Sequence, residues 1–170
     1  RILNEGLRES QIIELEPKSD IIITSFLDIN QEVRAMISWI FGCTFGRWDI
    51  RYATGEKQPP PLPDPFAPLP PCSPGMLQGE DGLPLAEAPS GYPIAIDLDG
   101  ILVDDPEHPD DIIRKIREVL RVIYTDKAEA IEQEACQILG IRELRDYFRK
   151  PGAKGFWDDH IKTYSKSRRK

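Results

Sequence analysis

Apolar residues recur at helical spacing in two long parts of the chain and predict a protein built mainly from helices. In the first part, "VRAMISWIFGCTFG", these positions are Val33, Met36, Ile37, Ile40 and Phe41. Residues three and four apart share one face of a helix, so we expect this helix to be buried on at least one side. Asp28 suits its cap position, with Gln31 three residues later. Gly42 and Gly46, four residues apart, would let another backbone approach closely.

The region before this helix has a weaker pattern. Residues 1–16 fit a short amphipathic helix through Leu3, Leu7, Ile12 and Leu15. "PKSD" then interrupts the pattern, and the β-branched run "IIITSFL" predicts a short strand or an extended connector.

The clearest amphipathic pattern lies in the C-terminal half. Asp110 and Asp111 stand at the positively polarised start of a predicted helix, whose apolar face is formed by Ile112, Ile113, Ile116, Val119, Leu120 and Ile123. "TDKAEAIEQEACQILG" predicts the next helix, with Asp126 and Glu129 as a capping pair and Gly140 as its stop. Its buried face would be Ile131, Ala135 and Ile138. Two shorter helices fit "IRELRDYFRK" and "GFWDDHIKTYSK", the second with an inward face of Phe156, Trp157, Ile161 and Tyr164.

Most of the 16 prolines fall between these two helical parts. Proline lacks an amide donor and fixes φ, so no helix or central strand is expected there. The prediction is one compact, mainly α domain with a helical part at 1–58, a long Pro-rich ordered insert at 59–93 and a helical part with a basic tail at 94–170. One short β pair is left open.

The composition indicates a cellular compartment and shows that charge is distributed unevenly along the chain. No apolar run approaches the roughly 20 residues of a membrane span. Three widely spaced cysteines favour a reducing compartment, so a cytoplasmic protein without membrane contact is expected. The net charge is -7, yet the part from Ile141 onward holds 10 Lys/Arg and only 4 Asp/Glu. The two histidines have no partner at metal-ligand spacing, so no metal site is predicted.

The stretch "IAIDLDGILVDD" is similar to the nucleophile loop of Mg²⁺-dependent phosphatases of the haloacid-dehalogenase type. There Asp97 would attack phosphorus and Asp99 would act as acid and base. That fold needs several βαβ units downstream, whereas the 65 residues after Asp105 predict helices. The alternative is a strand, "YPIAIDLDG", that turns at Asp99–Gly100 into the next helix.

Two groups near the C-terminus invite a functional interpretation. Asp158, Asp159 and His160 are adjacent, but neighbours on a helix point in different directions and should not converge. The end of the chain combines cations with an aromatic residue, and such residues neutralise phosphates and stack on bases. The candidate DNA-binding residues are Lys162, Tyr164, Lys166, Arg168, Arg169 and Lys170.

The order of several segments is more specific than any one motif. "ISWIFGCTFGRWD", the Pro-rich "LPDPFAPLPPCSPGMLQGEDGLP", "DGILVDDPEHPDDIIRKIREVL", "AEAIEQEACQILG", "LRDYFRKP" and "GFWDDHIKTYSKSRRK" follow one another. This order resembles the large adenine-specific DNA methyltransferases of phage-defence (BREX, PglX-like) and type IIG restriction-modification systems.

The resemblance implies a parent enzyme that uses S-adenosylmethionine to methylate adenine in DNA. The family's Asn-Pro-Pro-Tyr loop, which grips the flipped base, is not found here, and neither is a Gly-rich cofactor loop. No catalytic, cofactor-binding or metal residue is therefore assigned. The chain is expected to be a non-catalytic fragment, in agreement with its missing initiator Met. Its partners would be DNA, the parent's catalytic and target-recognition domains, and other defence-system proteins.

Two further functions stay open. In the first, the Pro-rich insert docks a protein of the defence complex, as Pro-rich segments do in other systems. In the second, the Asp-x-Asp loop makes the chain a small Mg²⁺-dependent phosphatase.

Overall fold

The longest helix, α2 (Lys18–Thr44), forms the axis of the molecule. The computed structural model describes residues 18–58, 64, 66–68, 70–73, 75–85, 87–96, 100–152 and 155–165. The helix expected in residues 1–16 lies outside them. The predicted strand or connector in "IIITSFL" is wrong, because these residues continue α2, and Asp28 lies inside the helix instead of capping it. A β-branched residue costs a helix well under 1 kcal/mol, and no proline or glycine interrupts α2 before Gly42.

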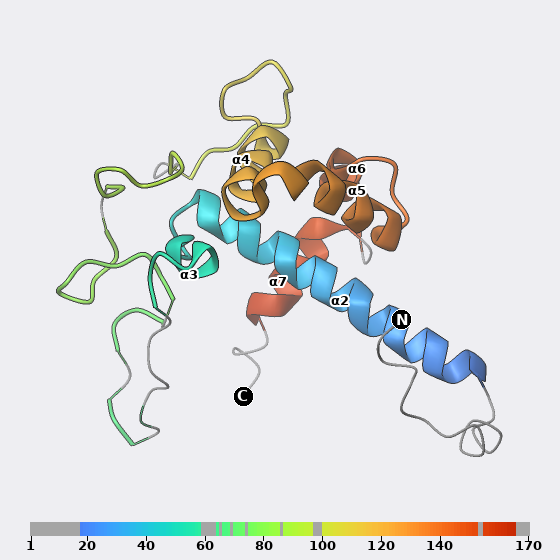
Figure 1. Cartoon of the computed structure of the whole chain (residues 1–170), viewed down its shortest axis with the longest axis horizontal. Helices are drawn as coiled ribbons and strands as arrows, with labels where there is room; N and C mark the ends of the chain where they lie inside the picture. Colours follow the sequence, from blue (N-terminus) through green and yellow to red (C-terminus); the bar gives the residue numbers. More distant parts are fainter. Residues whose placement is uncertain are drawn as a thin grey trace.

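The remaining helices pack around α2. The chain passes through α3 (Arg51–Thr54), α4 (Ile112–Tyr124), a 3₁₀ turn η1 (Thr125–Lys127), α5 (Ala128–Leu139), α6 (Leu144–Arg149) and α7 (Phe156–Ser165). Figure 1 shows α4 and α5 on one side of α2, with α7 crossing it on another side. The mainly α prediction is confirmed.

The helix boundaries in the C-terminal half largely follow the sequence. Asp111 is the N-cap of α4 and accepts a hydrogen bond from the Arg114 amide at 3.1 Å. Gly140 ends α5 in the left-handed region at φ 65°, as its sequence predicts. The capping pair is wrong, since Lys127 precedes α5 without a side-chain cap and Asp126 bonds to Thr125 instead. The η1 turn stands where a single longer helix was expected.

One core is shared by all the long helices. On α4 it includes five of the six residues of the predicted apolar face, and Ile123 is partly buried. Asn30 on α2 donates to the carbonyl of Ile138 on α5 at 2.8 Å, which fixes the two helices side by side. The core is completed by Ile37, Ile40, Phe41, Cys43, Ile50, Ile94, Ala128, Cys136, Leu144, Tyr147, Phe148 and Phe156.

The described residues of the Pro-rich insert contain no helix or strand, as proline content predicts. The insert nevertheless packs on the end of α2, since Cys72 and Leu77 are buried and Gly75 accepts the amide of Asp49 at 2.9 Å. Gly42 makes room for the side chain of Trp48, not for a second backbone. The three-part division at 59 and 93 remains a prediction.

The expected β structure is almost absent from the described residues. Two isolated bridges occur there, Gln78 with Pro84 and Val103 with Asp111. The described part of "YPIAIDLDG", residues 92–96 and 100, is not a strand. Asp97 to Asp99 lie outside the described residues. None of the helices in the described ranges is both long and apolar enough to cross a membrane.

Candidate functional site

The predicted DNA-binding residues belong to α7 and to the sequence that follows it. Lys162 is exposed, and its ammonium forms an ion pair with Asp158 one turn earlier. The backbone of Tyr164 lies in α7, and the position of its side chain is not described. Lys166, Arg168, Arg169 and Lys170 also lie outside the described residues, so their contact with DNA stays a prediction.

The inner face of α7 differs from the predicted one. Phe156 is fully buried, as expected, but Trp157 is 47% exposed and Ile161 62% exposed. The prediction of an inward Trp157 and Ile161 is wrong because polar contacts set the rotation of the helix. Asp159 and His160 point toward α2, and the apolar pair faces outward.

Asp159 connects three helices. It accepts an ion pair from Arg34 on α2 and a hydrogen bond from the hydroxyl of Tyr147 on α6 at 2.9 Å. Tyr147 is itself only 1% exposed. Burial and the neighbouring Asp159 carboxylate raise the pKa of Tyr147 above its ordinary value, so this phenol stays protonated and donates. Asp159 therefore fastens α7 instead of serving as a free acid or base.

His160 packs inside an aromatic cluster. Its ring stacks on Phe156 at 5.1 Å and meets the edge of Phe41 at 5.2 Å, and its Nδ1 lies 2.8 Å from the Ser38 hydroxyl. Burial, with a smaller contribution from the positive charge of Arg47, lowers the pKa of His160. The imidazole is neutral near pH 7 and holds α7 on α2. Asp158, Asp159 and His160 thus have three different partners, which confirms that they do not converge.

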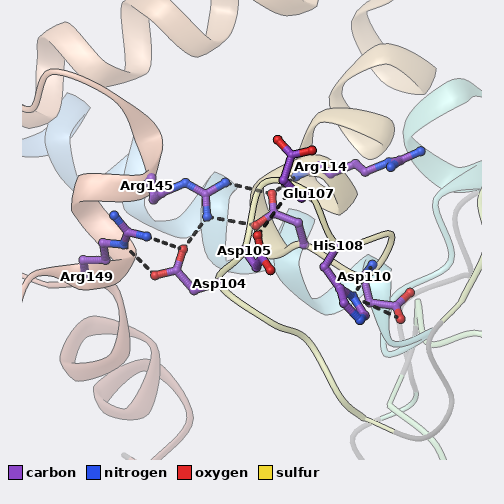
Figure 2. A network of polar contacts seen from close by, with 9 residues as sticks. Asp104, Asp105, Glu107, His108, Asp110, Arg114, Arg145 and Arg149 are labelled. Atoms are coloured by element: carbon purple, nitrogen blue, oxygen red, sulfur yellow. Dashed lines mark hydrogen bonds and ion pairs between the residues drawn. The ribbon is translucent and has the colours of Figure 1, made fainter.

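A second polar cluster joins the loop before α4 to α6, and Figure 2 shows its side chains. Arg145 binds both carboxylate oxygens of Asp111 at 2.8 Å and also pairs with Asp104. Arg149 binds the same Asp104 from the solvent side, with its Nε 2.6 Å from the carboxylate. Asp111 is nearly inaccessible to solvent. Two arginines thus compensate two carboxylates, and the loop is fixed to α6.

Asp104 and Asp105 belong to the stretch that resembles the phosphatase loop. Asp104 is engaged by Arg145 and Arg149, and Asp105 accepts the amide of Glu107 within its own loop. Among the described residues, no group of three His, Cys, Asp or Glu side chains could hold a metal ion. The described fold also offers no parallel sheet for an Asp97 nucleophile. The phosphatase hypothesis gains no support from this geometry.

A third cluster was missed from sequence. Asp49 has no solvent exposure and accepts two hydrogen bonds from the Arg51 guanidinium, at 2.9 and 2.8 Å, and one from Lys57 at 3.2 Å. Burial alone would raise the pKa of Asp49, but these donors lower it below its ordinary value. Burial and Asp49 together raise the pKa of the Cys43 thiol, which favours its protonated form. The signal was present in "RWDIR", where an acid between apolar residues is followed by a cation.

Two grooves lie on the described part of the chain. A groove of about 560 Å³ between α4 and α5 is lined by charged side chains, among which Arg117 and Glu132 form a bidentate pair. A groove of about 360 Å³ is mainly apolar and lies between the end of α2, the Pro-rich insert and α7. Its walls include Phe41, Phe45, Leu77 and His160.

Comparisons with protein-family models, curated proteins and solved structures found no match to this chain.

Proposed function

We propose that this chain is a non-catalytic helical segment of an S-adenosylmethionine-dependent, adenine-specific DNA methyltransferase of a phage-defence or restriction-modification system. It braces the catalytic domain and adds contacts to the DNA backbone. The proposal begins from the order of the segments and from the cation-rich sequence at the C-terminus. Methylation itself, and the cofactor, belong to the parent enzyme.

The observation that carries the proposal is the attachment of α7. This helix leads directly into Lys166–Lys170, and it is joined to the body by an aromatic contact, an ion pair and a hydrogen bond. The three inward residues are Phe156, Asp159 and His160. A helix held in this way is a rigid support for the basic sequence that follows.

The buried charges of the described residues support a structural role for the body of the chain. The buried Asp49 and Asp111 and the partly buried Asp159 are each bound by at least one arginine, and each contact joins separate elements or fixes a turn. Carboxylates used in this way stabilise the fold and are poorly placed to accept a substrate proton. This pattern is typical of a scaffold segment.

DNA binding is tested with four charge reversals in the tail, Lys166→Glu, Arg168→Glu, Arg169→Glu and Lys170→Glu. Fluorescence anisotropy of a labelled duplex is measured against salt concentration. Each lost phosphate contact should reduce the slope of log K against log salt by about 0.9. The matched control reverses four exposed cations in the described part of the chain: Arg114, Arg121, Lys127 and Arg142.

A salt slope that is unchanged in the tail variant would refute the DNA contact. Equal losses in the tail and control variants would assign the binding to net charge alone. Lys162→Gln should have a smaller effect than the tail substitutions, since its charge is already compensated by Asp158. The family assignment is tested in the parent reading frame, where an Asn-Pro-Pro-Tyr motif upstream of Arg1 is expected; a frame without it overturns the assignment.

A second candidate function is docking of a protein partner by the Pro-rich insert. Phe66, in the sequence "PDPF", is 93% exposed, an unusual position for a large aromatic side chain. Deletion of residues 59–70 leaves the buried Cys72 and Leu77 in place. Loss of a protein partner in a pull-down, with DNA binding unchanged, would favour this function over the first.

A further inference from the structure

The outward face of α7 is apolar. Trp157 and Ile161 lie one helical turn apart and are both exposed. The indole of Trp157 rests edge-on against Phe41, with ring centres 5.6 Å apart, so its position is fixed. Phe41 also lines the 360 Å³ apolar groove, but Trp157 and Ile161 do not, so the outer face of α7 is a separate small apolar surface.

One flank of this face carries a neutral charge pair. Asp158 and Lys162 are also one turn apart and bind each other. A surface for DNA would present uncompensated cations, whereas these two charges cancel. The face therefore suits a partner with exposed apolar residues beside one negative and one positive side chain spaced one helical turn apart.

We propose that a second copy of this chain covers the outer face of α7, with the two α7 helices antiparallel about a two-fold axis. In such an arrangement the same flank of both helices meets. Trp157 then lies against Ile161 of the second copy, and Asp158 lies opposite Lys162 of the second copy. The face is self-complementary in both apolar contact and charge, and the proposal does not depend on the methyltransferase assignment.

The expected contact is small. α7 has 10 residues and is about 15 Å long. Stable interfaces bury roughly 1,600 Å² in total, which two short helices do not reach alone. The dimer is therefore expected to be weak, with a dissociation constant of roughly micromolar or higher.

The test is sedimentation velocity of the 170-residue chain over a series from about 5 µM to about 500 µM. The unchanged chain should shift from monomer to dimer. Asp158→Lys places lysines opposite lysines, and Lys162→Asp places carboxylates opposite carboxylates. Each should weaken the dimer by about tenfold or more, since every dimer contains two such contacts.

Mixing the two variants gives the decisive result. Each variant keeps its repulsive pair within its own helix, but in a mixed dimer every lysine faces an aspartate. A heterodimer that forms from two monomeric variants supports the proposal. Circular dichroism of each variant verifies that its helix content is preserved, and Ile161→Glu, at an exposed position, should abolish dimerisation in the same assay.

Three results would overturn the proposal. The first is a chain that stays monomeric throughout the series. The second is a dimer that is insensitive to both charge variants, or a mixture that forms no heterodimer. The third is an Ile161→Glu variant that loses DNA affinity while its self-association is unchanged, because the face would then serve DNA.

Discussion

The guanidinium of Arg145 binds a carboxylate that has almost no contact with water, so Arg145→Leu should strongly destabilise the fold. The side chain of Asp111 is 3% exposed and that of Arg145 is 11% exposed. Both guanidinium hydrogen bonds to Asp111 measure 2.8 Å. After the substitution Asp111 retains the Arg114 amide as a donor, at 3.1 Å, but no cation. A buried charge would remain without its counter-charge.

Removal of one partner from a buried ion pair typically costs 3–5 kcal/mol of unfolding free energy, about 4 kcal/mol here. In a chain of this size each kcal/mol lowers the melting temperature by about 2–4 °C. Arg145→Leu should therefore lower the melting temperature by about 10 °C. The melting temperature is measured from thermal melts monitored by circular dichroism, and the free energy of unfolding is measured independently from urea titrations.

Two matched variants separate the buried pair from general charge effects. Arg149→Leu removes a contact to the exposed side of Asp104 and should shift the melting temperature far less. Asp111→Asn keeps an N-cap side chain but removes the buried charge. In the double variant Arg145→Leu/Asp111→Asn, part of the lost stability should return. A melting temperature within about 2 °C of the unchanged chain for Arg145→Leu, or strictly additive effects in the double variant, would refute the reasoning.

The pH dependence follows from the same contact. Burial alone would raise the pKa of Asp111, but hydrogen bonds from Arg145 and the Arg114 amide lower it below its ordinary value. The unfolded chain then takes up this proton at a higher pH than the folded chain does. The contribution of ionised Asp111 to the free energy of unfolding is complete above about pH 4, and it is lost as the pH falls through the pKa of Asp111 in the folded chain. Arg145→Leu should reduce this loss of stability under acid.

Three further predictions concern the core and α7. Phe156→Ala leaves a cavity at a fully buried site and should cost about 3–5 kcal/mol in urea titrations, while Phe66→Ala, at a 93% exposed site, should change little. Gly42→Ala would normally favour a helix, but its new Cβ would lie 2.5 Å from Cδ1 of Trp48. We therefore expect about 1–3 kcal/mol of destabilisation and altered tryptophan fluorescence. A stabilised variant would contradict the close contact. Burial, then Arg47, lowers the pKa of His160, so stability should fall as the pH drops below about 6.5. Urea midpoints at pH 7.5 and 5.5 should show this fall in the unchanged chain and in the exposed control His108→Gln, but not in His160→Gln.

Periodicity predicted the helices that have one apolar face. The pattern of α4 named five of its buried residues correctly, because most of its other face is charged. It missed Lys115, which is also buried, and Ile123 is only partly buried. The start of α2 was missed, since the β-branched run from Ile21 has the composition of a strand. This run is helical because it continues into the helix that follows. Single-residue propensities do not include this effect of neighbouring helical residues.

The polar clusters could be predicted only in part. Asp111 was placed correctly at the start of α4, where the sequence carries a local signal. Its partner Arg145 is 34 residues away, and nothing in the local pattern indicates that contact. Asp49 was missed for a related reason, because an acidic residue is ordinarily exposed and becomes buried only when its cations are close in space. Ion pairs between distant segments therefore cannot be predicted when the sequence is interpreted one segment at a time.

The rotation of α7 shows why hydrophobicity alone was insufficient. Phe156, Asp159 and His160 are three and four residues apart and form one face, while Trp157 and Ile161 form another. Both faces contain aromatic or apolar groups, so contacts with Arg34 and Ser38 decide which one is buried. The apolar pair that remains outside lies beside the ion pair of Asp158 and Lys162. The proposed dimer contact uses Asp158 and Lys162, whereas the DNA experiment changes Lys166, Arg168, Arg169 and Lys170, so the two proposals can be tested with separate sets of variants.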